Sequence, residues 1–231
     1  MLRSLAWALL WLLVSQPLAL ADDGDAATLD TSKVPKQATR LEQFAPPGWR
    51  IAQKYVGNLD SDPYPDAVLF LIESNGKKPE EPRGRGMALV VKKGDQYRLV
   101  GVSARTLLCT TCGGMLSNPA DDSVDFTVKN KVIIIKQLWG SREACDSTLR
   151  YRIDPTGRVA LIGADFDHYD RGSGESEIMS TNYLTGDRTI LRRQMHEKGP
   201  DTVLKRQQIK IKPRKIYIED VDPQMLAEAT K

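Results

Sequence analysis

The sequence has 231 residues, of which 41% are hydrophobic and 27% are charged, and its formal net charge is +3. This composition excludes a disordered chain, and the small net charge argues against a nucleic-acid-binding protein or one held to an anionic membrane by charge. The chain is long enough to bury one substantial hydrophobic core.

The first 21 residues have the layout of a secretory signal peptide. Arg3 precedes an apolar run of about ten residues, and Ala19 and Ala21 form an Ala-x-Ala cleavage site before Asp22. The run is too short for a membrane-spanning helix, which needs roughly 20 apolar residues. We therefore predict an exported protein, periplasmic or secreted, that has no transmembrane span and is soluble once residues 1–21 are removed.

The remaining chain divides into three parts by composition. Residues 22–45 are small and polar without an apolar period, which predicts a flexible N-terminal lead-in with a short helical turn at Leu41–Phe44. Residues 46–220 carry recurrent strand patterns and are predicted to form a single β-rich domain. Residues 221–231 are expected to be a short C-terminal helix or tail.

The strand patterns of the β-rich domain are short and are separated by turn residues such as Gly94-Asp95 and Asn130-Lys131. Connections of hairpin length predict an all-β fold, an antiparallel meander with short terminal helical segments. The spacing leaves open whether the sheet forms a sandwich, a barrel or a partial-propeller-like arrangement. The expected strands are 66–74, 87–94, 96–104, 122–130, 131–140, 147–154, 158–170, 176–184, 189–195, 207–212 and 215–220.

An acidic loop precedes the first of these apolar strands. Its oxygen-bearing side chains and the residue whose carbonyl completes the pattern are Asn58, Asp60, Asp62, Tyr64 and Asp66. Alternate residues of a tightly curled loop can supply the six to eight oxygen ligands that calcium takes. Two alternatives stay open, a calcium site and an Asx-rich turn that binds calcium weakly or not at all.

The loop resembles the calcium loop of FG-GAP or VCBS-type repeats, in which alternate Asp and Asn residues precede an apolar strand. The resemblance implies that calcium would be held by the carbonyl of Tyr64 and the side chains of Asn58, Asp60, Asp62 and Asp66. Pro63 departs from the pattern, because the repeats have a glycine there and proline cannot adopt a positive φ. The chain also contains only one copy of the motif.

Residues 46–190 are similar to a group of uncharacterised exported bacterial β-rich proteins. The shared motifs, in chain order, are "APPGW", the acidic loop, "LLCTTCGGM", "WGSREAC" and "STNYLTGDR". The similarity implies an exported, mostly β domain, and it implies no particular reaction.

The three cysteines belong to a chain that is expected to enter a compartment where disulfides persist. Cys109 and Cys112 favour a structural disulfide that closes a tight loop, with Cys145 as an unpaired thiol, and pairing with Cys145 is the alternative. A thiol–disulfide redox centre at Cys109 and Cys112 would need a helix N-terminus, and none is predicted there. A zinc site would need His168 or His196 as a further ligand.

A second polar cluster, "ADFDHYDRGSGES", contains Asp165, Asp167, His168 and Asp170. Carboxylates beside a histidine can bind a metal or transfer protons, so a secreted hydrolase is the main catalytic alternative. The segment "GSGES" does not match the Gly-x-Ser-x-Gly nucleophile elbow, and no other nucleophile accompanies the cluster. We therefore expect a solvated polar loop.

The C-terminal part carries a basic strip, a candidate docking surface for anionic lipid headgroups, a polysaccharide or an acidic protein. The pattern in "IKIKPRKIYIE" equally fits an edge strand that lysines keep soluble. The basic strip consists of Arg192, Arg193, Lys205, Arg206, Lys210, Lys212, Arg214 and Lys215.

These features together predict a non-catalytic exported protein that acts as a binding or envelope-accessory module. Its partner is expected to be an envelope protein or a polysaccharide, and its oligomeric state is not determined by the sequence. Calcium in the 58–66 loop is the one cofactor that the sequence suggests.

Overall fold

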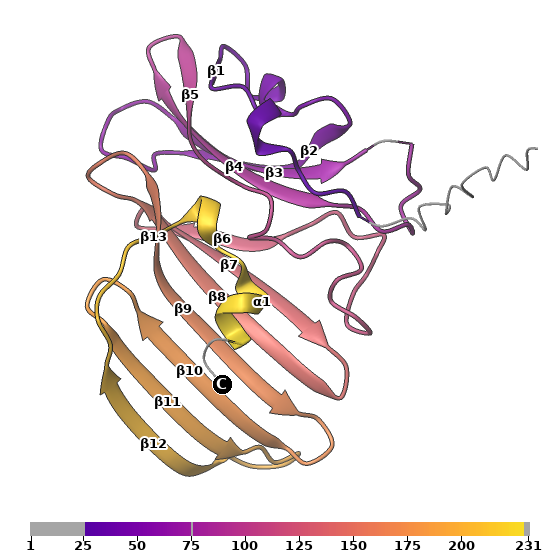
Figure 1. Ribbon diagram of the computed structural model, residues 1–231, viewed down its shortest axis with the longest axis vertical. Helices are drawn as coiled ribbons and strands as arrows, with labels where there is room; N and C mark the ends of the chain where they lie inside the picture. Colours follow the sequence, from indigo (N-terminus) through magenta and orange to yellow (C-terminus); the bar gives the residue numbers. More distant parts are fainter. Residues whose placement is uncertain (1–25, 75, 229–231) are drawn as a thin grey trace, which may run out of the picture.

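The computed structural model describes residues 26–74 and 76–228, so the predicted signal peptide over 1–21 lies outside the described residues. The described chain forms two antiparallel sheets, one above the other in Figure 1. The five-stranded sheet has the order β1-β5-β4-β3-β2. Its strands are β1 (Gln37–Ala38), β2 (Trp49–Gly57), β3 (Asp66–Glu73), β4 (Arg85–Lys93) and β5 (Gln96–Ser103).

The eight-stranded sheet has the order β12-β11-β10-β9-β8-β7-β6, and β13 pairs with the start of β9. Most strands lie beside their sequence neighbours and both sheets are open, so the predicted antiparallel meander is confirmed and neither sheet closes into a barrel. Its strands are β6 (Asp125–Lys129), β7 (Val132–Gly140), β8 (Glu143–Ile153), β9 (Val159–Asp170), β10 (Glu175–Asn182), β11 (Asp187–Gln194), β12 (Thr202–Lys210) and β13 (Ile216–Tyr217).

The turn between β6 and β7 follows the predicted pattern. Asn130 and Lys131 both have positive φ, 51° and 62°, as the two central residues of a type I′ hairpin turn require. Asparagine tolerates this left-handed conformation better than most residues, which explains its place at the first position.

One hydrophobic core joins the two sheets. The rings of Phe70 on β3 and Phe126 on β6 have centroids 4.5 Å apart, and Leu89, Leu149 and Tyr151 are buried in the same cluster. The inner face of the five-stranded sheet therefore packs on the β6–β9 half of the eight-stranded sheet. This arrangement leaves β10, β11 and β12 beyond the sandwich (Figure 1).

The opposite face of the five-stranded sheet is covered by the N-terminal segment, which differs from the predicted flexible lead-in over 22–45. From Ala26 onward this segment packs on β3 and β4 through four buried side chains and contains two 3-10 turns, η1 (Thr31–Lys33) and η2 (Leu41–Phe44). Its apolar residues have no helical or strand spacing, because they only have to fill the surface of β3 and β4. The four side chains are Leu29, Val34, Leu41 and Phe44.

The C-terminal segment closes the concave side of the eight-stranded sheet. It forms a 3-10 turn, η3 (Ile218–Asp220), and then the predicted short helix, α1 (Pro223–Glu228). Ile218, Val221 and Ala227 are buried in the core that joins the sheets. Figure 1 shows α1 lying across β8.

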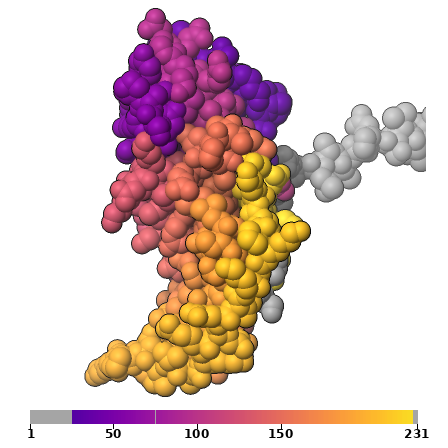
Figure 2. Space-filling model, turned by 90° about the vertical axis from the view of Figure 1, so that its left-hand side faces the viewer, coloured from indigo at the N-terminus to yellow at the C-terminus, as the bar shows by residue number. Residues whose placement is uncertain are grey.

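The two ends of the molecule differ in burial. All eight residues of β3 are buried, whereas all nine residues of β12 are exposed. Figure 2 shows the C-terminal strands tapering away from the N-terminal sheet. Among the described residues, no helix is long and apolar enough to cross a membrane.

Candidate functional site

The acidic loop is shaped by Asp66 at the start of β3. Its carboxylate is fully buried and accepts hydrogen bonds from the N–H groups of Leu59 at 2.8 Å, Asp60 at 3.1 Å and Lys92 at 3.0 Å. These three bonds fix the curvature of the loop and tie it to β4. Asp66 is therefore already engaged by the backbone of the chain.

Three carboxylates of this loop could hold a metal ion. One oxygen atom from each of Asp60, Asp62 and Asp66 lies within 4.8 Å of the other two. Asp60 and Asp62 also accept the N–H of the residue two positions further on, which gives two successive Asx turns. The side-chain amide of Asn58 donates to the carbonyl of Asp62, and Tyr64 is partly exposed.

Lys93, at the end of β4, brings an ammonium group to the same carboxylates. Its Nζ lies 2.9 Å from Asp60 Oδ2 and also donates to Asp62 Oδ2. The hydrogen bond from Lys93 and that from the N–H of Tyr64 lower the pKa of Asp62. The hydrogen bonds that Lys93 donates to Asp62 and, second, to Asp60 raise the pKa of Lys93. A cation of the chain thus already compensates one of the three negative charges of the loop.

Cys109 and Cys112 lie at disulfide distance, with their Sγ atoms 2.11 Å apart. The N–H of Cys112 donates to the carbonyl of Cys109, which closes the tight turn expected between them. This turn lies between β5 and β6, where no helix is present among the described residues. Cys145 is buried on β8 as a thiol.

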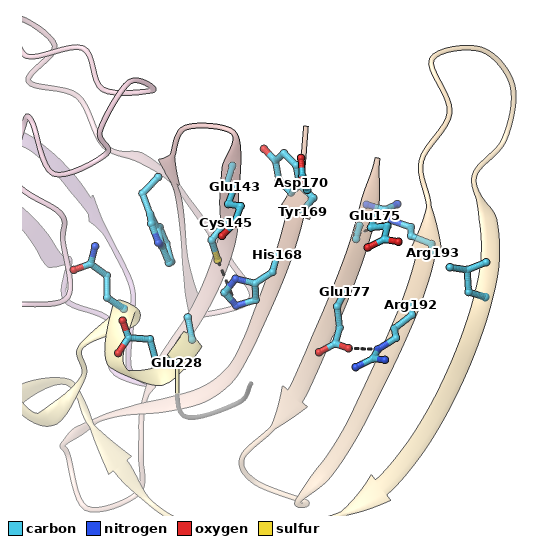
Figure 3. A pocket seen from close by; sticks show the side chains of 16 residues that line it. Glu143, Cys145, His168, Tyr169, Asp170, Glu175, Glu177, Arg192, Arg193 and Glu228 are labelled. Carbon is cyan, nitrogen blue, oxygen red and sulfur yellow. Dashed lines mark hydrogen bonds and ion pairs between the residues drawn. The ribbon is translucent and has the colours of Figure 1, made fainter. Parts of the chain in front are cut away.

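A concave trough of about 690 Å³ lies on the face of the eight-stranded sheet that α1 partly covers (Figure 3). We use the name trough for the cavity bounded by β7 to β12 and α1. Its apolar wall comes from one aromatic ring and three aliphatic side chains: Trp139, Ala144, Leu204 and Ala227.

A row of residues in register runs across the trough from strand to strand. Strand pairing places Cys145 opposite His168, His168 opposite Glu177, and Glu177 opposite Arg192. Cys145 Sγ lies 3.9 Å from His168 Nε2, and Glu177 accepts from Arg192, as the dashed lines in Figure 3 show. Residues opposite one another in this way project from the same face of a sheet.

The trough has an excess of negative charge. Arg192 pairs with Glu177, whereas Arg193 pairs with Asp167 and Asp201, and Asp170 pairs with Arg142. Within the described part of the chain, the remaining carboxylates of the trough form no ion pair. These are Glu143, Glu175 and Glu228.

The polar cluster around His168 is divided between the two faces of β9 and does not lie in a loop. His168 and Asp170 line the trough. Asp165 lies on the opposite face, bonded to Arg150 at 2.6 Å, and Asp167 bonds to Arg193 at the same distance. The period of two along a strand separates side chains that are adjacent in sequence. The four residues therefore do not form one constellation.

The basic strip is divided in the same way. Arg192 projects into the trough, while Arg193 pairs with carboxylates of β9 and of the segment before β12. Lys210 pairs with Asp187 at 2.7 Å. Lys205 and Arg206 lie on β12, and the other members follow it in the connection to β13: Lys212, Arg214 and Lys215.

Sequence reasoning missed most of the trough, including Trp139, Glu143, Glu175 and Glu177. Trp139 and Glu177 lie in strands that the sequence predicts, whereas Glu143 and Glu175 come before the predicted strands 147–154 and 176–184. Their convergence depends on the pairing register of the six strands β7 to β12, which no local pattern in the sequence indicates. The position of α1 over them depends on core packing of Ala227, far along the chain.

The chain was compared with protein-family models, with curated proteins and with solved structures, and nothing matches it in any of the three comparisons. The structure itself shows a β-rich fold with an acidic cluster at Asp60, Asp62 and Asp66, and it identifies no family.

Proposed function

We propose that this protein is a non-catalytic exported binding protein, and that its ligand carries a cationic group that enters the trough. The observation that carries this proposal is the combination of carboxylates without ion pairs and the Trp139 side chain around one cavity of about 690 Å³. Cavities of this size are typical of small-ligand sites, which combine an apolar wall with a few polar groups.

Electrostatics favours a cation over an anion in this cavity. Walls of low polarisability concentrate the field of Glu143, Glu175 and Glu228, so a positive group gains energy on entering. An ammonium or guanidinium group can also bind over the ring of Trp139 by a cation–π interaction. Polyamines and basic side chains of peptides have this chemistry.

The division of the His168 cluster supports a binding role over hydrolysis. The carboxylates of Asp165 and Asp167 are held on the other side of β9 by Arg150 and Arg193. A hydrolase would need a base and an acid that reach one substrate atom. In the trough, His168 has the buried thiol of Cys145 beside it.

The fluorescence of Trp139 provides a direct test. After residues 1–21 are removed, the chain keeps only Trp49 and Trp139, so a Trp49→Phe variant reports on the trough alone. Titration of this variant with spermidine is expected to change the emission with saturation, and titration with citrate is expected to leave it unchanged.

A matched pair of variants locates the effect. In the same background, Glu143→Gln together with Glu175→Gln is expected to weaken spermidine binding at least about tenfold, which corresponds to about 1.4 kcal/mol. Glu80→Gln, an exposed acid outside the trough, should bind as well as the parent. A response to citrate equal to that to spermidine, or no saturable response at millimolar spermidine, would contradict the proposal.

A second candidate function is calcium binding at the acidic loop, in line with its resemblance to FG-GAP or VCBS-type loops. The proximity of the three carboxylates favours it. Lys93 is the competitor, because a divalent ion at these oxygens must displace its ammonium group. We therefore propose that the wild-type loop binds calcium weakly and that Lys93 takes over part of the role of the ion.

Calorimetric titration with calcium chloride tests this candidate. Lys93→Met is expected to bind calcium at least about tenfold more tightly than wild type, since it removes one competing charge while all ligands remain. Lys92→Met, whose ammonium lies over the Tyr97 ring instead, is the control and should behave as wild type. Equal calcium affinities of wild type and Lys93→Met would show that Lys93 is no competitor.

Export is proposed from the leader at residues 1–21, and an envelope protein or polysaccharide remains the proposed partner. Expression of the full chain in a bacterial host, followed by N-terminal sequencing of the periplasmic fraction, is expected to give a chain beginning at Asp22. Recovery of the intact chain in the cytoplasm would contradict the export proposal.

A further inference from the structure

Strand β12 is the edge strand of the eight-stranded sheet, and its outer edge and both of its faces are exposed. One edge pairs with β11, and no strand in the described part of the chain pairs with the other edge. All nine of its residues are exposed, so nothing covers its two faces either. Figure 1 places β12 at the rim of the molecule, far from the five-stranded sheet.

This edge lacks most of the devices that keep edge strands from pairing. Proteins shorten such strands, interrupt them with proline or bulges, cover them, or place charged side chains on them, and of these devices β12 has one bulge and the charges of Lys205, Arg206 and Lys210. β12 is nine residues long and contains no proline. Its one bulge is at Leu204, which the register with β11 skips between Val203 and Lys205, so residues 205–210 pair with β11 without interruption. Its outer backbone N–H and C=O groups can therefore accept another strand.

The side chains of β12 add apolar surface that a partner could bury. Val203, Leu204 and Ile209 are 56%, 61% and 43% exposed. Leu204 also contributes to the rim of the trough, whereas Val203 and Ile209 do not line it. Three exposed aliphatic side chains on one open edge strand indicate a surface for a macromolecule.

The charge of β12 selects the kind of partner. Lys205 and Arg206 are neighbours, so they project from opposite faces and make the strand basic on both. Neither forms an ion pair within residues 26–74 and 76–228. In a two-fold pair of β12 strands these residues would lie near their own copies, and like charges opposed across strands are destabilising. A second copy is therefore disfavoured, and an acidic strand is favoured.

We propose that β12 binds an extended acidic segment of a partner protein by adding it to the sheet as one more strand. Backbone hydrogen bonds supply the pairing, acidic side chains face Lys205 and Arg206, and apolar residues cover Val203 and Ile209. This surface goes beyond the small-ligand site proposed for the trough, since it uses the outer edge of β12 and a macromolecular partner.

The test uses a labelled nonapeptide of alternating valine and glutamate, titrated with the purified protein by fluorescence polarisation. Saturable binding is expected, together with a loss of at least tenfold in affinity when alternate peptide nitrogens are methylated, because methylation removes the donors that strand addition needs. The peptide with lysine in place of glutamate is expected not to bind.

Two charge reversals locate the site on one edge of the sheet. Arg206→Glu is expected to weaken binding of the Val/Glu peptide at least tenfold. Lys129→Glu, on the strand β6 that forms the opposite edge, is the matched control and should bind as wild type.

Four results would overturn the proposal. Equal binding of the methylated and the unmodified peptide would show a surface that attracts anions without strand pairing. The same conclusion would follow if dextran sulfate displaced both peptides equally well. A dimer in sedimentation that Arg206→Glu abolishes would mean that a second copy occupies the edge. No saturable binding of the peptide at millimolar concentration would exclude the acidic-strand site.

Discussion

Strands β3 and β12 are nearly equal in length, and they lie at opposite extremes of burial. β3 has a neighbouring strand on each side and a packed layer on each face, so all eight residues are buried. β12 has one neighbouring strand and no layer, so all nine are exposed. Because burial of apolar surface drives folding, the free energy of folding comes mainly from the sandwich, and the exposed outer strand contributes little to it.

The largest loss of stability is expected from a substitution at the centre of the sandwich. Phe70→Ala removes a ring that is 1% exposed and contacts Phe126 of the other sheet. It should lower the free energy of unfolding by about 3–5 kcal/mol, through lost burial and the cavity that remains. Urea unfolding followed by circular dichroism measures this, and a loss below about 1 kcal/mol would show that the two sheets do not share a core.

A second expected effect concerns the buried carboxylate at the end of β3. Burial would raise the pKa of Glu73, but hydrogen bonds from the N–H groups of Ala27 and Gly84 and the ion pair with Lys77 outweigh it, so the pKa is lowered. Because the folded form has the lower pKa, this stabilisation is present above the ordinary pKa of a glutamate. It is lost as the pH falls through the lowered value.

Glu73→Gln should therefore cost about 1–3 kcal/mol at neutral pH and make stability less dependent on pH in the acid range. Thermal melting between neutral and acid pH measures both, with the exposed Glu80→Gln as the control. An unchanged pH profile in Glu73→Gln would mean that the N-terminal segment is not held by this carboxylate.

The turn closed by Cys109 and Cys112 should contribute less to the free energy of unfolding than Phe70 or Glu73 does. Replacement of Cys109 and Cys112 by serine removes a crosslink that encloses only four residues, so the expected loss is about 2 kcal/mol at most. Thiol titration in denaturant without reductant should detect one thiol, Cys145, and after reduction three. Three thiols before reduction would exclude the disulfide.

The smallest loss of stability is expected from a substitution on the edge strand β12. Val203→Ser on β12 changes a side chain that already contacts water, so the free energy of unfolding should stay within about 0.5 kcal/mol of wild type. The same urea titration used for Phe70→Ala measures it. A loss comparable with that of Phe70→Ala would mean that β12 belongs to the folding core, and the contrast drawn above would not hold.

Local patterns in the sequence predicted much of the fold. The apolar run of β3, the alternation in β6 and β8, and the turn at Asn130-Lys131 identified strands and their antiparallel order, because these signals act within a few residues. The boundaries of β8 and β12 were placed several residues late, since their first residues have no clear alternation. The close pair of Cys109 and Cys112 was favoured by their short separation in a chain expected to be exported, with pairing to Cys145 as the alternative.

Contacts between residues that are far apart in the sequence depend on the tertiary structure. The segment from Ala26 to Phe44 is ordered because it fills the outer face of β3 and β4, and its own sequence carries no period. Lys93 reaches the acidic loop because β4 pairs with β3, and the trough exists because six strands, β7 to β12, align beneath α1. Local sequence patterns predict most of the strands and their alternation, but the expected strands do not include β1 or β2. Only packing decided which faces are covered, since burial depends on what the rest of the chain brings to each face.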